Sequence, residues 1–93
     1  MTKDNIKEKN SEALNKSIGK NRILILHNDE VNTFDFVIES LVKVCEHDEI
    51  QAEQCAFITH YKGKCDVKKG ALNTLRTMKN KLIDRGLSVT IDD

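Results

Sequence analysis

The chain has 93 residues, of which 32% are charged, and its 15 basic residues balance 15 acidic ones. This length suits one small domain with a limited core, which leaves little room for a large enclosed active site. The sequence has no apolar run of membrane-spanning length, no secretory signal, and three cysteines, an odd number, so we expect a reducing, cytoplasmic setting and no membrane partner.

The charges are unevenly distributed along the chain. Residues 28–57 hold eight acidic residues and one basic residue, Lys43, whereas residues 62–85 hold eight basic and two acidic residues. Such a bipolar chain suits an electropositive ligand at one end and a protein partner at the other, and it equally fits two solvated helix faces of opposite charge.

Residues 1–21 are predicted to be a disordered N-terminal extension, because they are rich in lysine and poor in apolar side chains. Residues 22–93 form the predicted folded domain. Within it, the short, partly β-branched apolar run 23–26 predicts a strand that is buried on both faces. Thr33 follows as an N-cap, and apolar residues at helical spacing predict a helix that extends to Cys45.

A second helix is predicted from Asp48 and Gln51, which form a capping-box-like pair three residues apart. Its apolar side continues to Thr59, and we expect the helix to end at His60. Residues 61–67 contain Gly63, which disfavours a helix and predicts a modest strand or an extended loop.

The last third of the chain predicts a helix and a strand. An apolar stripe at three- and four-residue steps runs from Ala71 to Ile83, and Gly86 follows it as a C-cap signal. Residues 87–91 alternate in polarity, which is typical of a strand. The expected order β-α-α-β-α-β corresponds to an α/β (α+β) two-layer sandwich.

Polar residues gather where the first strand ends. The stretch from Leu26 to Glu30 places an imidazole, an amide and two carboxylates at the end of the apolar run, from His27, Asn28, Asp29 and Glu30. Such a strand-loop-helix joint holds its acceptor oxygens toward solvent. A simpler interpretation is that Asn and Asp are favoured in any such loop, because their side chains hydrogen-bond nearby backbone groups.

The segment from Asn28 to Val37, which reads N-D-E-V-N-T-F-D-F-V, resembles the N-D-D-x-T-P-M-E-F-V segment of the ClpS family. A second block, from Thr59 to Cys65, is similar to that family's V-H-x-x-G-x-x block, and the resemblance extends from about Arg22 to the C-terminus. The family consists of non-catalytic adaptors that recognise the N-terminal residues of proteins marked for degradation. The resemblance implies three helices packed on a small antiparallel three-stranded sheet.

By this resemblance, Asn28, Asp29 and His60 bind the free α-amine of a substrate protein. An α-amine has a pKa of about 7.7–8.0 and is largely an ammonium with three donors, so it needs several converging acceptors. Asn28 offers an amide oxygen, Asp29 a charged oxygen and His60 a neutral ring nitrogen, directly or through water. Glu30, which replaces the family's second Asp, forms an acidic rim.

The resemblance also implies a pocket for the first side chain of the substrate. Phe34 stands where a gatekeeping Met is usual and narrows the mouth, whereas Ala56, where another Met is common, deepens the floor. The implied substrates are proteins that begin with Leu, Phe, Tyr or Trp. The candidate pocket residues are Asn32, Phe34, Val37, Ala56, Thr59 and Leu87.

The implied protein partner is the N-terminal domain of a ClpA- or ClpC-type AAA+ unfoldase. Arg76 falls on the position of a lysine in the family's docking helix. We expect no cofactor and no metal, because Cys45, Cys55 and Cys65 lie ten residues apart and lack the tight spacing of a zinc site. Their expected role is that of small buried apolar residues.

Other functions and roles are also open. An enzyme is disfavoured because the chain has no His-Glu-x-x-His motif and no phosphate-binding loop. A ribosomal-stalk-like α/β interaction domain would have a similar outline and would ignore free N-terminal amines. A nucleic-acid partner is not expected, because the basic stretch 62–85 lacks a clear stacking platform. Individually, His60 also fits a cation at a helix C-terminus, and Phe34 fits a core residue.

Overall fold

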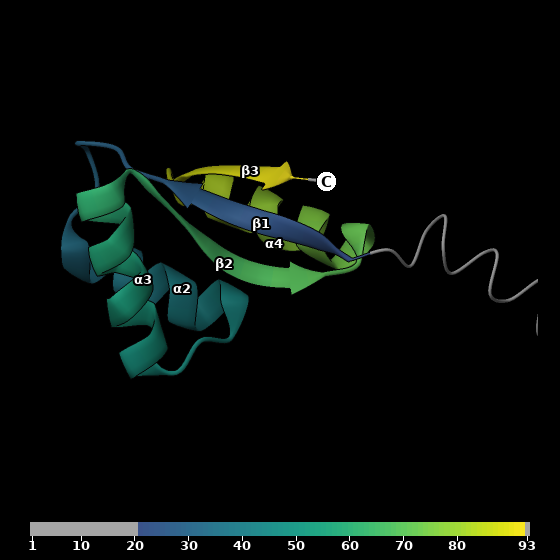
Figure 1. Ribbon diagram of the computed structural model, residues 1–93, viewed down its shortest axis with the longest axis horizontal. Coiled ribbons are helices and arrows are strands. Elements are labelled where there is room, and N and C mark those ends of the chain that lie inside the picture. Colours follow the sequence, from purple (N-terminus) through teal and green to yellow (C-terminus); the bar gives the residue numbers. More distant parts are fainter. Residues whose placement is uncertain (1–20, 93) are drawn as a thin grey trace, which may run out of the picture.

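The computed structural model describes residues 21–92, which form a three-stranded antiparallel sheet and three helices in the predicted order β-α-α-β-α-β (Figure 1). The predicted extension, apart from residue 21, lies outside the described residues. The predicted two-layer α/β architecture is confirmed. The elements are β1 (Arg22–His27), α2 (Phe34–Cys45), α3 (Glu49–Lys62), β2 (Lys64–Gly70), α4 (Leu72–Asp84) and β3 (Ser88–Asp92).

The strand β1 is the centre of the sheet, whose strand order is β2-β1-β3 with both pairs antiparallel. Leu24 and Leu26 point to one face and are almost completely buried, while Ile25, which points to the other face, is only 8% exposed. This explains the unbroken apolar run at the start of the domain, because Leu24 and Leu26 pack into the core and Ile25 on the other face is also removed from solvent.

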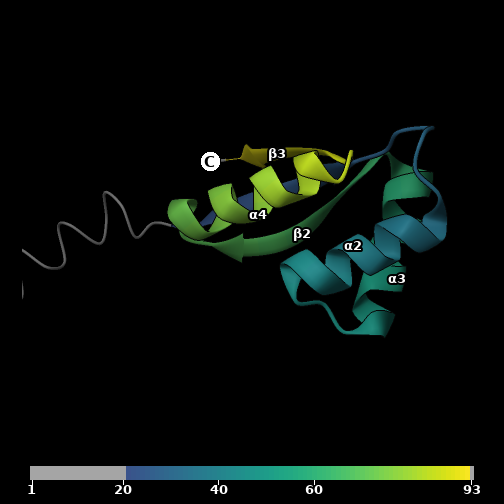
Figure 2. The ribbon, with the colours of Figure 1, turned by 180° about the vertical axis from the view of Figure 1, so that it is seen from behind.

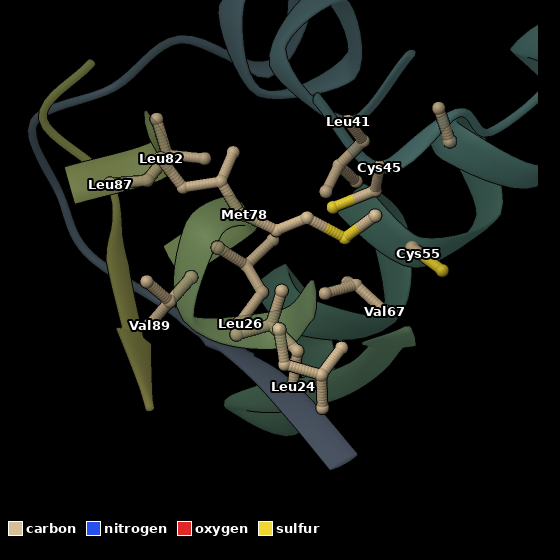
Figure 3. Close-up of a cluster of buried hydrophobic side chains, with 12 residues drawn as sticks. Leu24, Leu26, Leu41, Cys45, Cys55, Val67, Met78, Leu82, Leu87 and Val89 are labelled. Carbon is tan, nitrogen blue, oxygen red and sulfur yellow. The ribbon is translucent and has the colours of Figure 1, made fainter. Parts of the chain in front are cut away.

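One hydrophobic core joins the sheet to the helices. The helix α4 runs along the sheet, and α2 and α3 form a hairpin at one end of the molecule beside β2 (Figure 2). Figure 3 shows side chains from all six elements meeting in this core. The core includes Leu24 and Leu26 of β1, Val67 of β2, Val89 of β3, Leu41 and Cys45 of α2, Cys55 of α3, and Leu75, Met78 and Leu82 of α4.

The helix starts predicted from the sequence are confirmed. The Thr33 hydroxyl accepts a hydrogen bond from the Phe36 N–H at 3.1 Å, and the Asp48 carboxylate accepts one from the Gln51 N–H at 2.7 Å. Gly86 follows α4 with a φ of 91°, in the left-handed region that favours glycine.

The predicted end of the second helix is wrong by two residues. The helix α3 continues past His60 to Lys62, and Gly63 then terminates it with a φ of 95°. The Gly63 N–H donates to the Thr59 carbonyl at 2.9 Å, which satisfies one of the free carbonyls of the last turn. The glycine that the sequence placed inside a strand or loop is therefore the helix cap, and β2 starts directly after it.

The strand β2 contains an irregularity that the sequence did not reveal. The pairing register with β1 shifts between Leu24 and Ile25, whose partners are Lys68 and Asp66, so Val67 is an extra, bulged residue. The Val67 carbonyl instead contacts Nε2 of the buried His47 at 2.6 Å. His47 therefore ties the α2–α3 connection to the sheet.

Candidate functional site

The loop between β1 and α2 is held from both sides by backbone carbonyls of distant segments. The Asn28 N–H donates to the carbonyl of Gly63 at 2.9 Å, which places the start of the loop against the end of α3. The Asn32 side-chain amide donates to the carbonyl of Gly86, also at 2.9 Å, which attaches the loop to the turn before β3. These bonds bring three segments that are far apart in the sequence around one hollow.

That hollow is a small cavity of about 50 Å³ that opens beside this loop. All nine residues predicted to bind an α-amine or a first side chain line it, although they come from three separate stretches of the sequence, 28–37, 56–60 and 87. The lining residues are Leu26, His27, Asn28, Asp29, Asn32, Phe34, Val37, Ala56, Thr59, His60 and Leu87.

Asp29 supplies the negative charge of the cavity and also organises the loop. Its Oδ1 accepts hydrogen bonds from the N–H groups of Val31 and Asn32, each at 3.0 Å, and its Oδ2 accepts one from the Asn32 side-chain amide at 3.1 Å. Partial burial raises the pKa of Asp29, but these hydrogen bonds outweigh it and hold the pKa below its ordinary value of 3.8. Asp29 is therefore ionised at neutral pH.

Asn28 is exposed at the polar edge of the cavity. Its side-chain Nδ2 donates to Oε2 of Glu30 at 3.4 Å, which directs the amide hydrogens toward Glu30 and leaves the amide oxygen as an acceptor on the other branch. Glu30 itself is exposed and does not line the cavity, so its position fits a charged rim.

Other lining residues of the cavity are buried and mainly apolar. Ala56 and Thr59 come from α3, and Leu87 comes from the turn before β3; each is at most 5% exposed. The Thr59 hydroxyl donates to the Cys55 carbonyl at 2.8 Å, so the polar group of this residue is already satisfied within the helix. The cavity lining therefore combines charged and amide acceptors with apolar surface.

Phe34 lies at the mouth of the cavity and is 39% exposed, so the interpretation of this residue as core is wrong. Its ring meets the ring of His60 edge to face, with centroids 6.1 Å apart, and meets Phe57 in the same way at 6.3 Å. The first residue of α2 therefore lies at the surface beside the cavity, and its ring borders the cavity instead of packing into the core.

Two lining residues, Leu26 and His27, belong to the polar stretch noted in the sequence but were given no binding role from it. Their position in the sequence could have indicated such a role, because both directly precede Asn28 at the end of the apolar run. Nε2 of His27 lies 2.7 Å from the Thr90 hydroxyl, which fixes the imidazole against β3. Only the strand pairing shows that the end of β1 forms a wall of the cavity.

Arg76, the predicted docking residue, is exposed on α4 and does not line the cavity. A larger open groove of about 700 Å³ lies between α2 and α3, and it contains none of the predicted site residues. In the described part of the chain, no group of three or more His, Cys, Asp or Glu residues is placed to hold a metal ion. No helix among residues 21–92 has the length and apolar character needed to cross a membrane.

The chain was compared with known proteins at the levels of sequence and structure. Residues 20–90 match the family model of the ATP-dependent Clp protease adaptor protein ClpS. No curated protein sequence matches the chain. The fold is similar to that of Agrobacterium tumefaciens ClpS2 bound to L-phenylalaninamide, with a TM-score of 0.75, 22% sequence identity, and coverage of 78% of this chain and 95% of that one. The match over residues 20–90 shows that the chain belongs to the ClpS family, whose members are non-catalytic adaptor proteins of the Clp protease.

Proposed function

We propose that this adaptor binds the free α-amine and the bulky hydrophobic first side chain of N-degron proteins. The observation that carries the proposal is that one cavity is lined both by the acceptors of Asn28 and Asp29 and by the buried apolar side chains of Ala56 and Leu87. The ligand of the Agrobacterium ClpS2 structure, L-phenylalaninamide, has both groups that such a cavity would take, an α-amine and an aromatic side chain.

The amine is bound through charge-assisted hydrogen bonds. Oδ1 of Asp29 already accepts several hydrogen bonds within the loop, so Oδ2 has the greater remaining capacity for an ammonium donor. The Asn28 amide oxygen and a His60 ring nitrogen provide the other two acceptors. Each hydrogen bond to a charged group contributes about 1.5–3 kcal/mol. The loss of two such bonds should therefore make an acetylated peptide bind much more weakly than one with a free amine. After association costs, we expect micromolar affinity.

The first side chain enters the apolar part of the cavity once Phe34 moves. A volume of about 50 Å³ is too small for a phenyl ring, since an engineered cavity that holds benzene measures roughly 150 Å³. Phe34 is partly exposed at the start of α2, so its ring has solvent space into which it can turn. Substrates that begin with Leu, Phe, Tyr or Trp then bury their side chains against Val37, Ala56 and Leu87.

The deciding experiment compares two fluorescent peptides that begin with Phe and differ only in N-acetylation. Fluorescence anisotropy should give a dissociation constant near micromolar for the free amine and at least tenfold weaker binding for the acetylated peptide. Equal binding of both peptides would contradict amine recognition. A second series that varies only the first residue tests the pocket, because Ser should bind more weakly than Leu, Phe, Tyr and Trp.

The second half of the proposal is delivery to the N-terminal domain of a ClpA- or ClpC-type AAA+ unfoldase. Arg76 is exposed on α4, away from the cavity, so a substrate and an unfoldase domain would occupy different surfaces. The test measures binding of purified ClpA and ClpC N-terminal domains to wild type and to Arg76→Glu. Lys81→Glu is the matched control, because it makes the same charge change on another exposed position of α4.

Loss of unfoldase binding in Arg76→Glu, with retention in Lys81→Glu and unchanged peptide affinity in both, would support Arg76 as a docking residue. Equal unfoldase binding by both variants and wild type would remove Arg76 from the interface. A difference between the two unfoldase domains would identify which type is the partner.

A further inference from the structure

An exposed apolar row runs along α3, next to the mouth of the cavity. Phe57 and Tyr61 are 53% and 69% exposed, and Ile58 lies beside Phe57 with 40% of its surface exposed. Residues separated by three and four positions share one face of a helix, so these side chains form a continuous strip. Contiguous exposed apolar patches on small proteins commonly mark binding sites.

Ring contacts connect this strip to the cavity. The Phe34 ring lines the cavity and meets Phe57 edge to face, with centroids 6.3 Å apart. The ring centroids of Phe57 and Tyr61 are 4.4 Å apart, and those of Tyr61 and His60 are 5.0 Å apart. His60, like Phe34, lines the cavity. The four rings Phe34, Phe57, His60 and Tyr61 therefore form one cluster, which we call the aromatic ridge.

An open hollow of about 600 Å³ lies on the outer side of Phe34. Phe34 lines both this hollow and the cavity, so its side chain borders the two spaces. The outer hollow has mostly apolar walls from Phe57 and Ile58, and the Glu53 side chain borders it. Its position continues the proposed binding site beyond the mouth.

We propose that the aromatic ridge and the hollow beside it form a second subsite, which binds a large apolar or aromatic side chain at the second position of the substrate. The inference rests on the proposed function and extends it to the residue after the N-terminus. When the first side chain is in the cavity, its α-carbon lies at the mouth between Phe34 and His60. The next α-carbon is about 3.8 Å away, so the second side chain reaches Phe57.

The chemistry of the hollow selects the side chain. Phe57 and Tyr61 offer exposed ring faces and edges, which pair favourably with an aromatic side chain. The contacts of Tyr61 with Phe57 and His60 do not involve Phe34, so they persist when Phe34 turns outward. An acidic second residue is disfavoured, because Glu53 borders the hollow and Asp29 and Glu30 lie at the cavity end of the site. The subsite therefore favours Trp, Phe or Leu over Ser, and Ser over Asp.

The test uses peptides with Phe first and either Trp or Ser second, each with a free and an acetylated amine. Wild type should bind the free Phe-Trp peptide about fivefold more tightly than Phe-Ser. Phe57→Ala should reduce this ratio to about one and leave the Phe-Ser affinity unchanged. Ile83→Ala is the matched control, because Ile83 is a similarly exposed apolar residue on α4, and it should retain the fivefold ratio.

Equal binding of Phe-Trp and Phe-Ser by wild type would overturn the second subsite, while the proposed function would stand if acetylation still weakened both peptides. A preference that persisted in Phe57→Ala would also overturn it, because Phe57 is its central contact. If neither free-amine peptide bound, both proposals would fail. Phe57 is more than half exposed, so its replacement by Ala should leave the unfolding midpoint nearly unchanged.

Discussion

The side-chain amide of Asn32 donates to the carbonyl of Gly86 at 2.9 Å, across 54 positions of sequence. The same nitrogen lies 3.1 Å from Oδ2 of Asp29. One amide group therefore connects the β1–α2 loop to the turn before β3 and also orients the carboxylate that we propose binds the α-amine. The stability of the loop and the geometry of the site depend on the same side chain.

We expect Asn32→Ala to lower the free energy of unfolding by about 1–2 kcal/mol, because the partners of the amide lose their hydrogen bonds. Urea unfolding measures this change, and anisotropy with the free Phe peptide should show weaker binding. Asn80→Ala, at an exposed position on α4, is the control and should change neither quantity. Wild-type affinity in a destabilised Asn32→Ala would show that the amide supports the fold without orienting Asp29.

Asp29 should make the stability of the domain depend on pH. Its pKa is lower in the folded chain than in the unfolded chain, because the loop hydrogen bonds outweigh the effect of partial burial. Its contribution is therefore complete above the ordinary Asp pKa of 3.8 and is lost as the pH falls through the folded pKa. Unfolding midpoints across the acidic range should fall less steeply for Asp29→Asn than for wild type, and parallel curves would contradict this account.

Substitutions at two histidines should separate effects on stability from effects on peptide binding. His47 is buried and its Nε2 contacts the bulged Val67 carbonyl, so His47→Ala leaves an unpaired carbonyl and a void. We expect a loss of about 2–4 kcal/mol in the free energy of unfolding. His60 is exposed at the cavity mouth, so His60→Ala should change stability by less than about 0.5 kcal/mol while weakening binding of the free-amine peptide. A large loss of stability in His60→Ala with little change in His47→Ala would contradict the structural role of His47 and the binding role of His60.

The cysteine thiols should react slowly in the folded protein. Burial raises the pKa of Cys45 from 9.0 to about 11, and burial with the neighbouring Cys55 raises that of Cys65 to about 12. Few thiolates therefore form near neutral pH. Labelling by a thiol reagent should be much slower in native protein than in urea. Because the unfolded chain ionises first, stability should also fall as the pH rises above 9.0. Equal labelling rates in both states would contradict this prediction.

Phe34 should limit the size of the first side chain. Phe34→Ala removes the ring that covers a cavity of about 50 Å³, so binding of a peptide that begins with Trp should improve relative to one that begins with Leu by about threefold. Anisotropy titrations of both peptides measure the ratio. Phe36→Ala is unsuitable as a control, because Phe36 packs against the core. Val42→Ala is suitable, because Val42 is an exposed residue of α2 that does not line the cavity. An unchanged Trp-to-Leu ratio in Phe34→Ala would show that Phe34 does not gate the cavity.

Local features of the fold could be predicted from the sequence because their causes are local. Thr33 and Asp48 cap helices through atoms only three residues away, and Gly86 adopts a positive φ that other residues rarely take. The apolar run in β1 indicated a central strand before any pairing was known. The end of α3 was misjudged because Gly63 interrupts a helix and caps one equally well, and the choice between them depends on where β2 begins.

The amino-acid sequence by itself identified most of the residues that line the cavity, since the Asn28–Val37 segment and the block around His60 are each continuous in the chain. Tertiary structure decided how those residues are used. The bulge at Val67, the bond from Asn32 to Gly86 and the contact between Phe34 and Phe57 all join segments that are distant in sequence. Their geometry follows from strand register and helix packing, which depend on the whole core and cannot be read from any single segment.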